Sequence, residues 1–171
     1  GPYNEEDAPN PINYYGVTKQ HAEDAVKEFS DNWCIVRTVL VYGKPLTGRN
    51  NLLTIVKNKL ERGEEYNVVT DQERTPTYVE DLAKGIVSII DKKATGIYHI
   101  SGGETFTPYD MAVQTAEYLG LNKNLLNKVT AASFKEPAKR PPLAGFIIDK
   151  AKKELDFRPV SFAEGLRKTF E

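Results

Sequence analysis

Hydrophobic residues along the chain change from a helical spacing to a strand-like spacing and back. Residues 1–11 contain three prolines and predict an extended lead-in. The next segment, "INYYGVTKQHAEDAVKEFS", predicts a helix that extends to about Ser30, with Pro11 in its first turn. The apolar, β-branched run "WCIVRTVLVYG" follows, and it predicts one buried strand that ends in a loop at Gly43. Loops at such strand ends commonly form binding sites.

The alternation of helix and strand patterns continues to the end of the chain. The downstream segments predict a helix at 52–62, a strand at 64–70, a helix at 75–93, a strand at 96–101 and a turn with a helix at 102–120. Helical spacing in the segment 75–93 is given by its apolar residues Leu82, Ile86, Ile89 and Ile90. The remainder predicts one short strand and two short helices. Because no repeat or linker interrupts this order, we predict a single α/β unit over residues 1–171.

Composition and charge narrow the classes of protein. The 171 residues are 40% hydrophobic and 27% charged, with a net charge of -1, so there is no electrostatic reason to expect nucleic acid or an anionic membrane as a partner. No apolar run approaches the roughly 20 residues that span a bilayer. Residues 1–10 lack the basic and apolar regions of a signal peptide. One cysteine permits no internal disulfide, so we expect a reducing compartment, the cytoplasm.

Few side chains have the neighbours that metal or nucleophilic catalysis requires. The two histidines, His21 and His99, have no Cys, Asp or Glu at metal-ligand spacing, so we expect no metal site. His99 alternates within a predicted strand and is expected to be partly buried. Cys34 is expected to be a small buried hydrophobic residue. Ser101 lacks the context of a nucleophilic serine, so a serine hydrolase is not supported.

Tyr15 and Lys19 are four residues apart in the first predicted helix and therefore share one of its faces. An ammonium group beside a phenol favours the phenolate form, so Lys19 would tune Tyr15 for proton transfer. The spacing alone decides nothing, because the chain has nine tyrosines and is rich in lysine, and an exposed pair on a solvated face has the same spacing. Tyr14 lies about 100° away around the helix and is expected to pack.

Longer motifs surround this pair. The segment "YNEEDAPNPINYYGVTK" contains the pattern Y-x-E-x-D-x-P-x-P-x-N-x-Y-G-x-T-K, and "IVRTVLVYG", "TPTYVEDLA", "GIYHISGGE" and "PAKRPPLAGFIIDKAKKEL" follow in order. Over almost the whole chain, these stretches resemble the dTDP-4-dehydrorhamnose reductase family of extended short-chain dehydrogenase/reductases. The resemblance implies the C-terminal part of a Rossmann-type α/β fold. It would comprise the last strands of the parallel sheet and the small substrate-binding subdomain.

The resemblance also implies roles for residues around the first helix. Tyr15 would protonate the C4 carbonyl oxygen of a nucleotide-linked 4-keto-6-deoxysugar. Lys19 would bond the nicotinamide ribose of NADPH or NADH, so both residues would also contact the cofactor. Arg37, Thr38 and Val39 would run beside the nicotinamide.

Three further residues are candidates for the substrate side. Leu40 stands where many family members have Trp, since this chain has "RTVLVYG" in place of "RTSWVYG", and it would form an apolar wall without a stacking surface. Arg74 and Arg140 are either diphosphate ligands, because guanidinium groups match phosphate geometry, or solvated loop arginines. Asp81 is expected to have a helix-capping or dipole role, and Thr77 a packing and turn role.

A full family member is roughly twice this length. Its first half carries a glycine-rich dinucleotide loop and a catalytic Ser or Thr, and no G-x-x-G-x-x-G occurs here. We therefore expect the C-terminal half of a truncated reductase, with the N-terminal dinucleotide-binding half absent. Such a chain is expected to be inactive alone and to cover exposed apolar surface by self-association or with the missing half.

Two other functions remain open from the same motifs. The family resembles the regulatory subunit of methionine adenosyltransferase, which keeps the fold and acts through protein contacts. The retained Tyr15 and Lys19 argue against this function, whereas Leu40 leaves it open. The other alternative is a sibling sugar-nucleotide epimerase or dehydratase.

Overall fold

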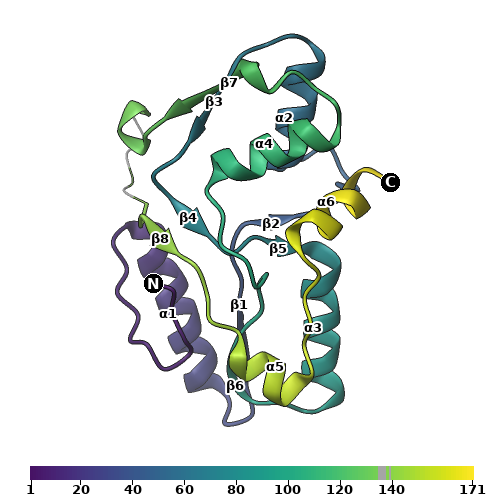
Figure 1. Ribbon diagram of the computed structural model, residues 1–171. Helices are drawn as coiled ribbons and strands as arrows, with labels where there is room; N and C mark the ends of the chain where they lie inside the picture. The colour runs from purple at the N-terminus through teal and green to yellow at the C-terminus, as the bar shows by residue number, and fades with distance from the viewer. Residues whose placement is uncertain (135–137, 139) are drawn as a thin grey trace.

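The computed structural model describes residues 1–134, 138 and 140–171, in which helices and strands alternate (Figure 1). Within these residues the strands form four short parallel pairs: β1 with β6, β2 with β5, β3 with β7 and β4 with β8. The strands are β1 (Cys34–Arg37), β2 (Val41–Tyr42), β3 (Tyr66–Val69), β4 (Glu73–Arg74), β5 (Thr77–Tyr78), β6 (Gly96–His99), β7 (Leu126–Val129) and β8 (Leu143–Ala144). The helices are α1 (Tyr14–Phe29), α2 (Leu52–Glu61), α3 (Val79–Asp91), α4 (Pro108–Tyr118), α5 (Asp149–Leu155) and α6 (Phe162–Phe170), with 3₁₀ turns at Lys123–Leu125 and Ala131–Ser133. Residues 137 and 139, in the motif "PAKRPP", lie outside the described residues.

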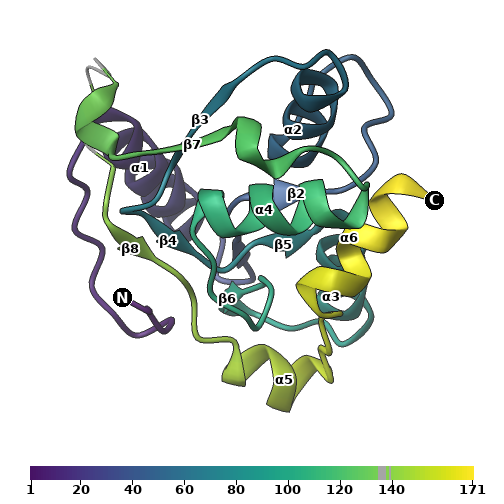
Figure 2. The same cartoon turned by 45° about the horizontal axis from the view of Figure 1, so that its top comes forward.

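The pair of β1 and β6 lies between α1 on one side and α3 on the other (Figures 1 and 2). Helix α5, from the C-terminal part of the chain, packs against β6 and α3. The buried side chains of this region are Ile89, Tyr98, Ile100, Ile148, Ala151, Leu155 and Phe157. Segments far apart in the sequence therefore share this hydrophobic cluster, and a single α/β unit over residues 1–171 stays a prediction.

The prediction of one buried strand across residues 33–43 is wrong. The run is divided into β1 and β2 at Leu40, whose φ of 44° lies in the left-handed region. This conformation costs an L-residue roughly 1–2 kcal/mol, so a contact elsewhere must hold it. Before the turn, β1 pairs with β6, and after it β2 pairs with β5. The strand β1 is also only partly buried.

A smaller packed unit forms around β3 and β7, at the top of Figure 1. Helices α2 and α4 pack on each other and on β3, and each begins with a capping box. The buried side chains of this unit are Val56, Leu60, Val68, Ala112, Ala116 and Leu126. A second cluster, which includes Tyr42, Tyr78 and Phe162, joins this unit to β2, β5 and α6.

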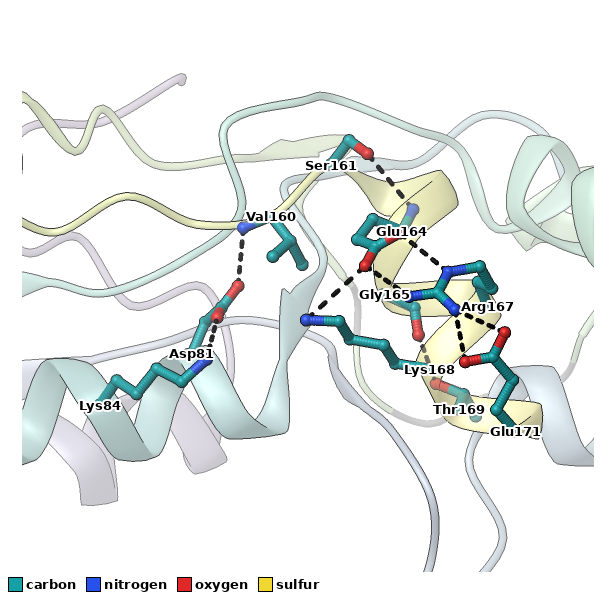
Figure 3. A network of polar contacts seen from close by, with 10 residues as sticks. All are labelled: Asp81, Lys84, Val160, Ser161, Glu164, Gly165, Arg167, Lys168, Thr169 and Glu171. Atoms are coloured by element: carbon teal, nitrogen blue, oxygen red, sulfur yellow. Dashed lines mark hydrogen bonds and ion pairs between the residues drawn. The ribbon is translucent and has the colours of Figure 1, made fainter.

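The C-terminal helix α6 is tied to α3 through the segment that precedes it (Figure 3). The buried Asp81 carboxylate in the first turn of α3 accepts the N–H of Val160 at 2.8 Å and lies 3.5 Å from the ammonium of Lys84. Within α6, Glu164 binds Arg167, as the same view shows. Asp81 therefore connects two helices, which goes beyond the capping or dipole role predicted for it.

Two helices expose apolar side chains. No residue of α1 is buried, and Tyr14, which was predicted to pack, is 81% exposed. In α3, Ile86 and Ile90 are exposed whereas Ile89 is buried. Part of the apolar surface of α1 and α3 is thus left exposed by the described residues. None of the helices in the described ranges has the length and apolar composition to cross a bilayer.

The extended lead-in lies against the outer edge of β6. The carboxylate of Glu5 accepts the N–H of His99 at 2.9 Å, and the ammonium of Lys150 donates to the carbonyl of Ile97 at 2.8 Å. Both backbone groups point away from β1, so two charged side chains occupy an edge at which another strand could pair. Ring stacking on Phe146, at 4.1 Å between centroids, completes the surroundings of His99.

His99 is completely buried, so the prediction of partial burial is wrong. Burial lowers the pKa of the His99 ring. As the pH drops, the His99 ring is protonated at a higher pH in the unfolded chain than in the folded chain. We therefore expect the free energy of unfolding to fall as the pH drops below about 6.5. Urea unfolding between about pH 7.5 and pH 5 measures this, and His99→Gln should lose less stability over that interval than the wild type.

The matched control for this prediction is His21→Gln, because His21 is the other histidine and is exposed. This control should keep the pH dependence of the wild type. An equal loss of stability in His99→Gln and the wild type would contradict the prediction.

Candidate functional site

The start of α1 places Tyr15 and Lys19 at the surface. Asn13 caps the helix by accepting the N–H of Gly16 at 2.9 Å. Tyr15 is 70% exposed, and the ammonium of Lys19 lies 5.3 Å from the centroid of its ring. The structure therefore brings the predicted pair together, with a positive charge beside a phenol that is open to solvent.

Arg37, the last residue of β1, forms a two-armed ion pair with Glu23 of α1. Its Nε donates to Oε1 at 2.8 Å and its Nη2 donates to Oε2 at 2.6 Å. Both side chains are only 18% exposed. The bond to Arg37 lowers the pKa of Glu23 and raises the pKa of Arg37, so the pair stays charged at neutral pH. This contact directs the Arg37 guanidinium at α1, and its predicted place beside a nicotinamide stays a prediction.

Thr77 of β5 holds the loop that follows β1. Its buried hydroxyl donates to the carbonyl of Val39 at 2.8 Å and accepts the hydroxyl of Thr38 at 3.1 Å. Its N–H donates to the carbonyl of Leu40 at 3.2 Å. These bonds secure the left-handed turn at Leu40, which is 36% exposed. Thr77 thus positions Thr38, Val39 and Leu40, three of the residues predicted to line the cofactor or the sugar.

Arg74 and Arg140 are near enough for one charge to affect the other. Arg74 donates through Nη2 to Oε1 of Gln72 at 3.2 Å and through Nη1 to the carbonyl of Glu73 at 2.6 Å. Burial lowers the pKa of Arg74, and the positive charge of Arg140 lowers it further. Within the described part of the chain, no carboxylate binds Arg74. Arg74 and Arg140 are near each other, and guanidinium groups match the geometry of a phosphate.

The other candidate side chains have structural partners. Cys34 packs against the core as predicted but is only half-buried, and this burial raises the pKa of its thiol. Ser101 is buried and bonds to Thr75 and to the carbonyl of Gly102. Among residues 1–134, 138 and 140–171, no group of three or more His, Cys, Asp or Glu side chains could hold a metal ion.

Parallel strands flanked by helices, with the Tyr15 and Lys19 helix leading into β1, place the chain in the Rossmann-type extended short-chain dehydrogenase/reductases. The RmlD substrate binding domain family matches residues 1–171. The chain belongs to this family.

The relatives of the chain include a reductase and a subunit of methionine adenosyltransferase. The chain is 37% identical over 129 residues to dTDP-4-keto-6-deoxy-D-glucose reductase of Streptomyces niveus, covering 75% of this chain and 44% of that protein. It is 32% identical over 135 residues to methionine adenosyltransferase 2 subunit beta of Xenopus tropicalis, covering 75% of this chain and 40% of that protein.

The crystal structure of dTDP-4-dehydrorhamnose reductase from Bacillus anthracis, in complex with NADP, is similar with a TM-score of 0.90 and 32% identity. The similarity covers 98% of this chain and 58% of the reductase. The chain thus spans about half the length of the proteins that it matches.

The positions of Glu23 and Thr77 in the site were not predicted from the sequence. Glu23 follows Lys19 by four residues, as Lys19 follows Tyr15, and this repeated spacing is a signal for a shared face. Nothing in the sequence indicates that Glu23 binds Arg37 of β1. Thr77 was assigned to packing because nothing near it in the sequence shows that β5 lies beside the loop after β1.

We expect the Thr77 hydroxyl to stabilise the turn at Leu40. Thr77→Val should lower the free energy of unfolding by about 1–3 kcal/mol, because the carbonyl of Val39 and the hydroxyl of Thr38 lose a buried partner. Thr77→Ser keeps the hydroxyl and should lose less. Urea unfolding monitored by fluorescence measures the three proteins.

Thr115→Val is the matched control, since the Thr115 hydroxyl is equally buried and donates to the carbonyl of Met111 at 2.7 Å. That carbonyl already accepts a helical N–H, so the control should lose less stability than Thr77→Val. Equal losses in Thr77→Val and Thr77→Ser would contradict a role for the hydroxyl.

Proposed function

We propose that this chain is the substrate-side half of an NAD(P)H-dependent reductase of a nucleotide-linked 4-keto-6-deoxysugar. The proposed enzyme is similar to dTDP-4-dehydrorhamnose reductase and belongs to dTDP-rhamnose biosynthesis. The observation that carries the proposal is the exposed Tyr15 with the ammonium of Lys19 5.3 Å from its ring centroid, on the helix that leads into β1. The similarity to the Streptomyces and Bacillus reductases supports the same reaction class.

The proposed chemistry is a proton transfer coupled to reduction of a carbonyl group. A bound nicotinamide would supply the hydride to C4 of the sugar. Tyr15 donates its phenolic proton to the C4 oxygen, and Lys19 stabilises the phenolate that remains and binds the nicotinamide ribose. The products are the sugar alcohol and the oxidised cofactor, and solvent returns the proton to Tyr15.

The loop of Thr38, Val39 and Leu40 supports the proposed cofactor position. It leaves the carboxyl end of β1, where open α/β sheets bind their ligands, and Thr38 is exposed. We assign Thr38 and Val39 to the nicotinamide edge and place Arg37 behind it. The cofactor is NADPH or NADH, and the main dinucleotide contacts come from the N-terminal half that the longer relatives contain.

The substrate contacts of the proposal lie on β4 and on the loops. Arg74 and Arg140 bind the diphosphate of the nucleotide-linked sugar, supported by the proximity of the two guanidinium groups. Leu40 forms an apolar wall beside the sugar. The single cysteine supports a reducing compartment, and we place the reaction in the cytoplasm. The exposed apolar surface of α1 and α3 is covered by the N-terminal half or by self-association.

A second candidate is a regulatory subunit with the same fold. The observation that favours it is the 32% identity to methionine adenosyltransferase 2 subunit beta over 75% of the chain. In that case Tyr15→Phe would leave the function of the complete protein unchanged. A sibling epimerase or dehydratase would instead be identified by NMR of its sugar product.

We expect Tyr15→Phe in the complete protein to abolish reduction of dTDP-4-dehydrorhamnose. Loss of the general acid should lower kcat about 100-fold or more, measured as oxidation of NADPH. Tyr14→Phe is the matched control, because it removes the neighbouring hydroxyl, and Tyr14 is 81% exposed. Full turnover by Tyr15→Phe would refute the proposed role of this hydroxyl.

We expect residues 1–171 alone to show no turnover of NADPH with the same sugar. The dinucleotide half of the longer relatives fixes the hydride donor, and without it the donor has no defined position. The assay compares this chain with the complete protein at equal concentration. Reduction of the sugar by the 171-residue chain alone would disprove the expectation.

A further inference from the structure

The ion pair between Glu23 and Arg37 is the main polar attachment of α1. None of the α1 residues is buried, and the helix touches the rest of the described chain through a narrow stripe that includes Glu23. Among the described residues, no other side-chain hydrogen bond from within α1 reaches another helix or strand. A two-armed bond between a guanidinium and a carboxylate is a directional contact, so it restricts the rotation of α1 about its own axis.

Glu23 lies on the same side of α1 as the proposed catalytic pair. At 100° per residue, Lys19 is offset by about 40° from Tyr15, and Glu23 by about 80°. Glu23 and Tyr15 are also about 12 Å apart along the axis, at 1.5 Å per residue. Because α1 connects to β1 through residues 30–33, the helix runs back along the strand. Glu23 meets Arg37 where β1 ends, and Tyr15 lies eight residues nearer the start of α1, about 12 Å further along the helix axis.

The surroundings of the ion pair favour its charged form. Glu23 faces Arg37, with Lys27 and His99 further away. Arg37 faces Glu23, with Glu5 as a second carboxylate nearby. His99, opposite Arg37 in the register of β1 and β6, is buried with its pKa lowered, which favours its neutral form. The contact is therefore a fixed support at neutral pH and has no switching role.

We propose that Glu23 and Arg37 are positioning residues, whose two-armed bond sets the rotation of α1 so that Tyr15 and Lys19 face the carboxyl end of β1. This inference rests on the proposed reductase function. Arg37 thereby orients the catalytic pair by holding α1, in addition to its proposed place behind the nicotinamide. A rotation of α1 of a few tens of degrees would carry the Tyr15 hydroxyl away from the reacting oxygen.

The test is steady-state kinetics of the complete protein carrying Glu23→Gln or Arg37→Lys. Glu23→Gln keeps the shape and removes the charge, and Arg37→Lys keeps the charge and removes the fork. We expect kcat to fall about 10- to 100-fold in both variants, because misplacement of a catalytic group by about 1 Å has an effect of this size. The KM for the nucleotide sugar should stay within about twofold, since the proposed diphosphate contacts lie elsewhere. Activities are divided by the folded fraction, measured by circular dichroism.

Glu28→Gln is the matched control, because it is the same substitution on an exposed position of the same helix, and it should keep the kcat of the wild type. The outcomes separate the two claims. If the wild type turns over, Tyr15→Phe does not, and Glu23→Gln keeps the wild-type kcat, the positioning role is refuted and the reductase function stands. A loss in Glu23→Gln that appears only in KM or in the folded fraction also refutes it. If the wild type reduces no keto-sugar, the proposed function fails and the positioning role with it.

Discussion

The bond between Arg37 and Glu23 joins the strand that leads to the site with the helix that carries Tyr15. Both side chains are 18% exposed, and two short hydrogen bonds connect them. Burial of two charges is favourable only with good geometry, which the planar guanidinium and carboxylate provide. Within the described residues this bond is the side-chain contact that fixes α1 to β1. The catalytic pair proposed for Tyr15 and Lys19 depends in turn on the orientation of this helix.

A second constraint acts at the end of β1. The left-handed backbone of Leu40 turns the chain out of the first strand pair, and the bonds from Thr77 to the preceding residues hold it there. The loop is thus supported from β5, while α1 is supported from β1. The helix of the proposed proton donor is held by the bond between Glu23 and Arg37, and the proposed cofactor loop is held by the bonds from Thr77. Both sets of bonds lie at the carboxyl end of β1. Such an arrangement holds reacting groups in place without requiring burial of the groups themselves.

The sequence predicted those parts of the structure that local patterns determine. The helix expected at 52–62 is observed as Leu52–Glu61, because its cap and its apolar spacing are both local. The break at Leu40 was missed, since it depends on Thr77, which is 37 positions further along the chain and has no local signal. The exposure of Tyr14 was also missed. Its aromatic ring was expected to pack, whereas the described residues leave it 81% exposed.

A crystal structure of the complete protein with NADP and the nucleotide sugar bound tests the proposed role of Tyr15 most directly. The Tyr15 hydroxyl should lie within about 3 Å of the sugar C4 oxygen. Lys19 should lie at the nicotinamide ribose, and the bond between Glu23 and Arg37 should be intact. A structure in which another side chain contacts the C4 oxygen, with Tyr15 turned away from the sugar, would contradict that role.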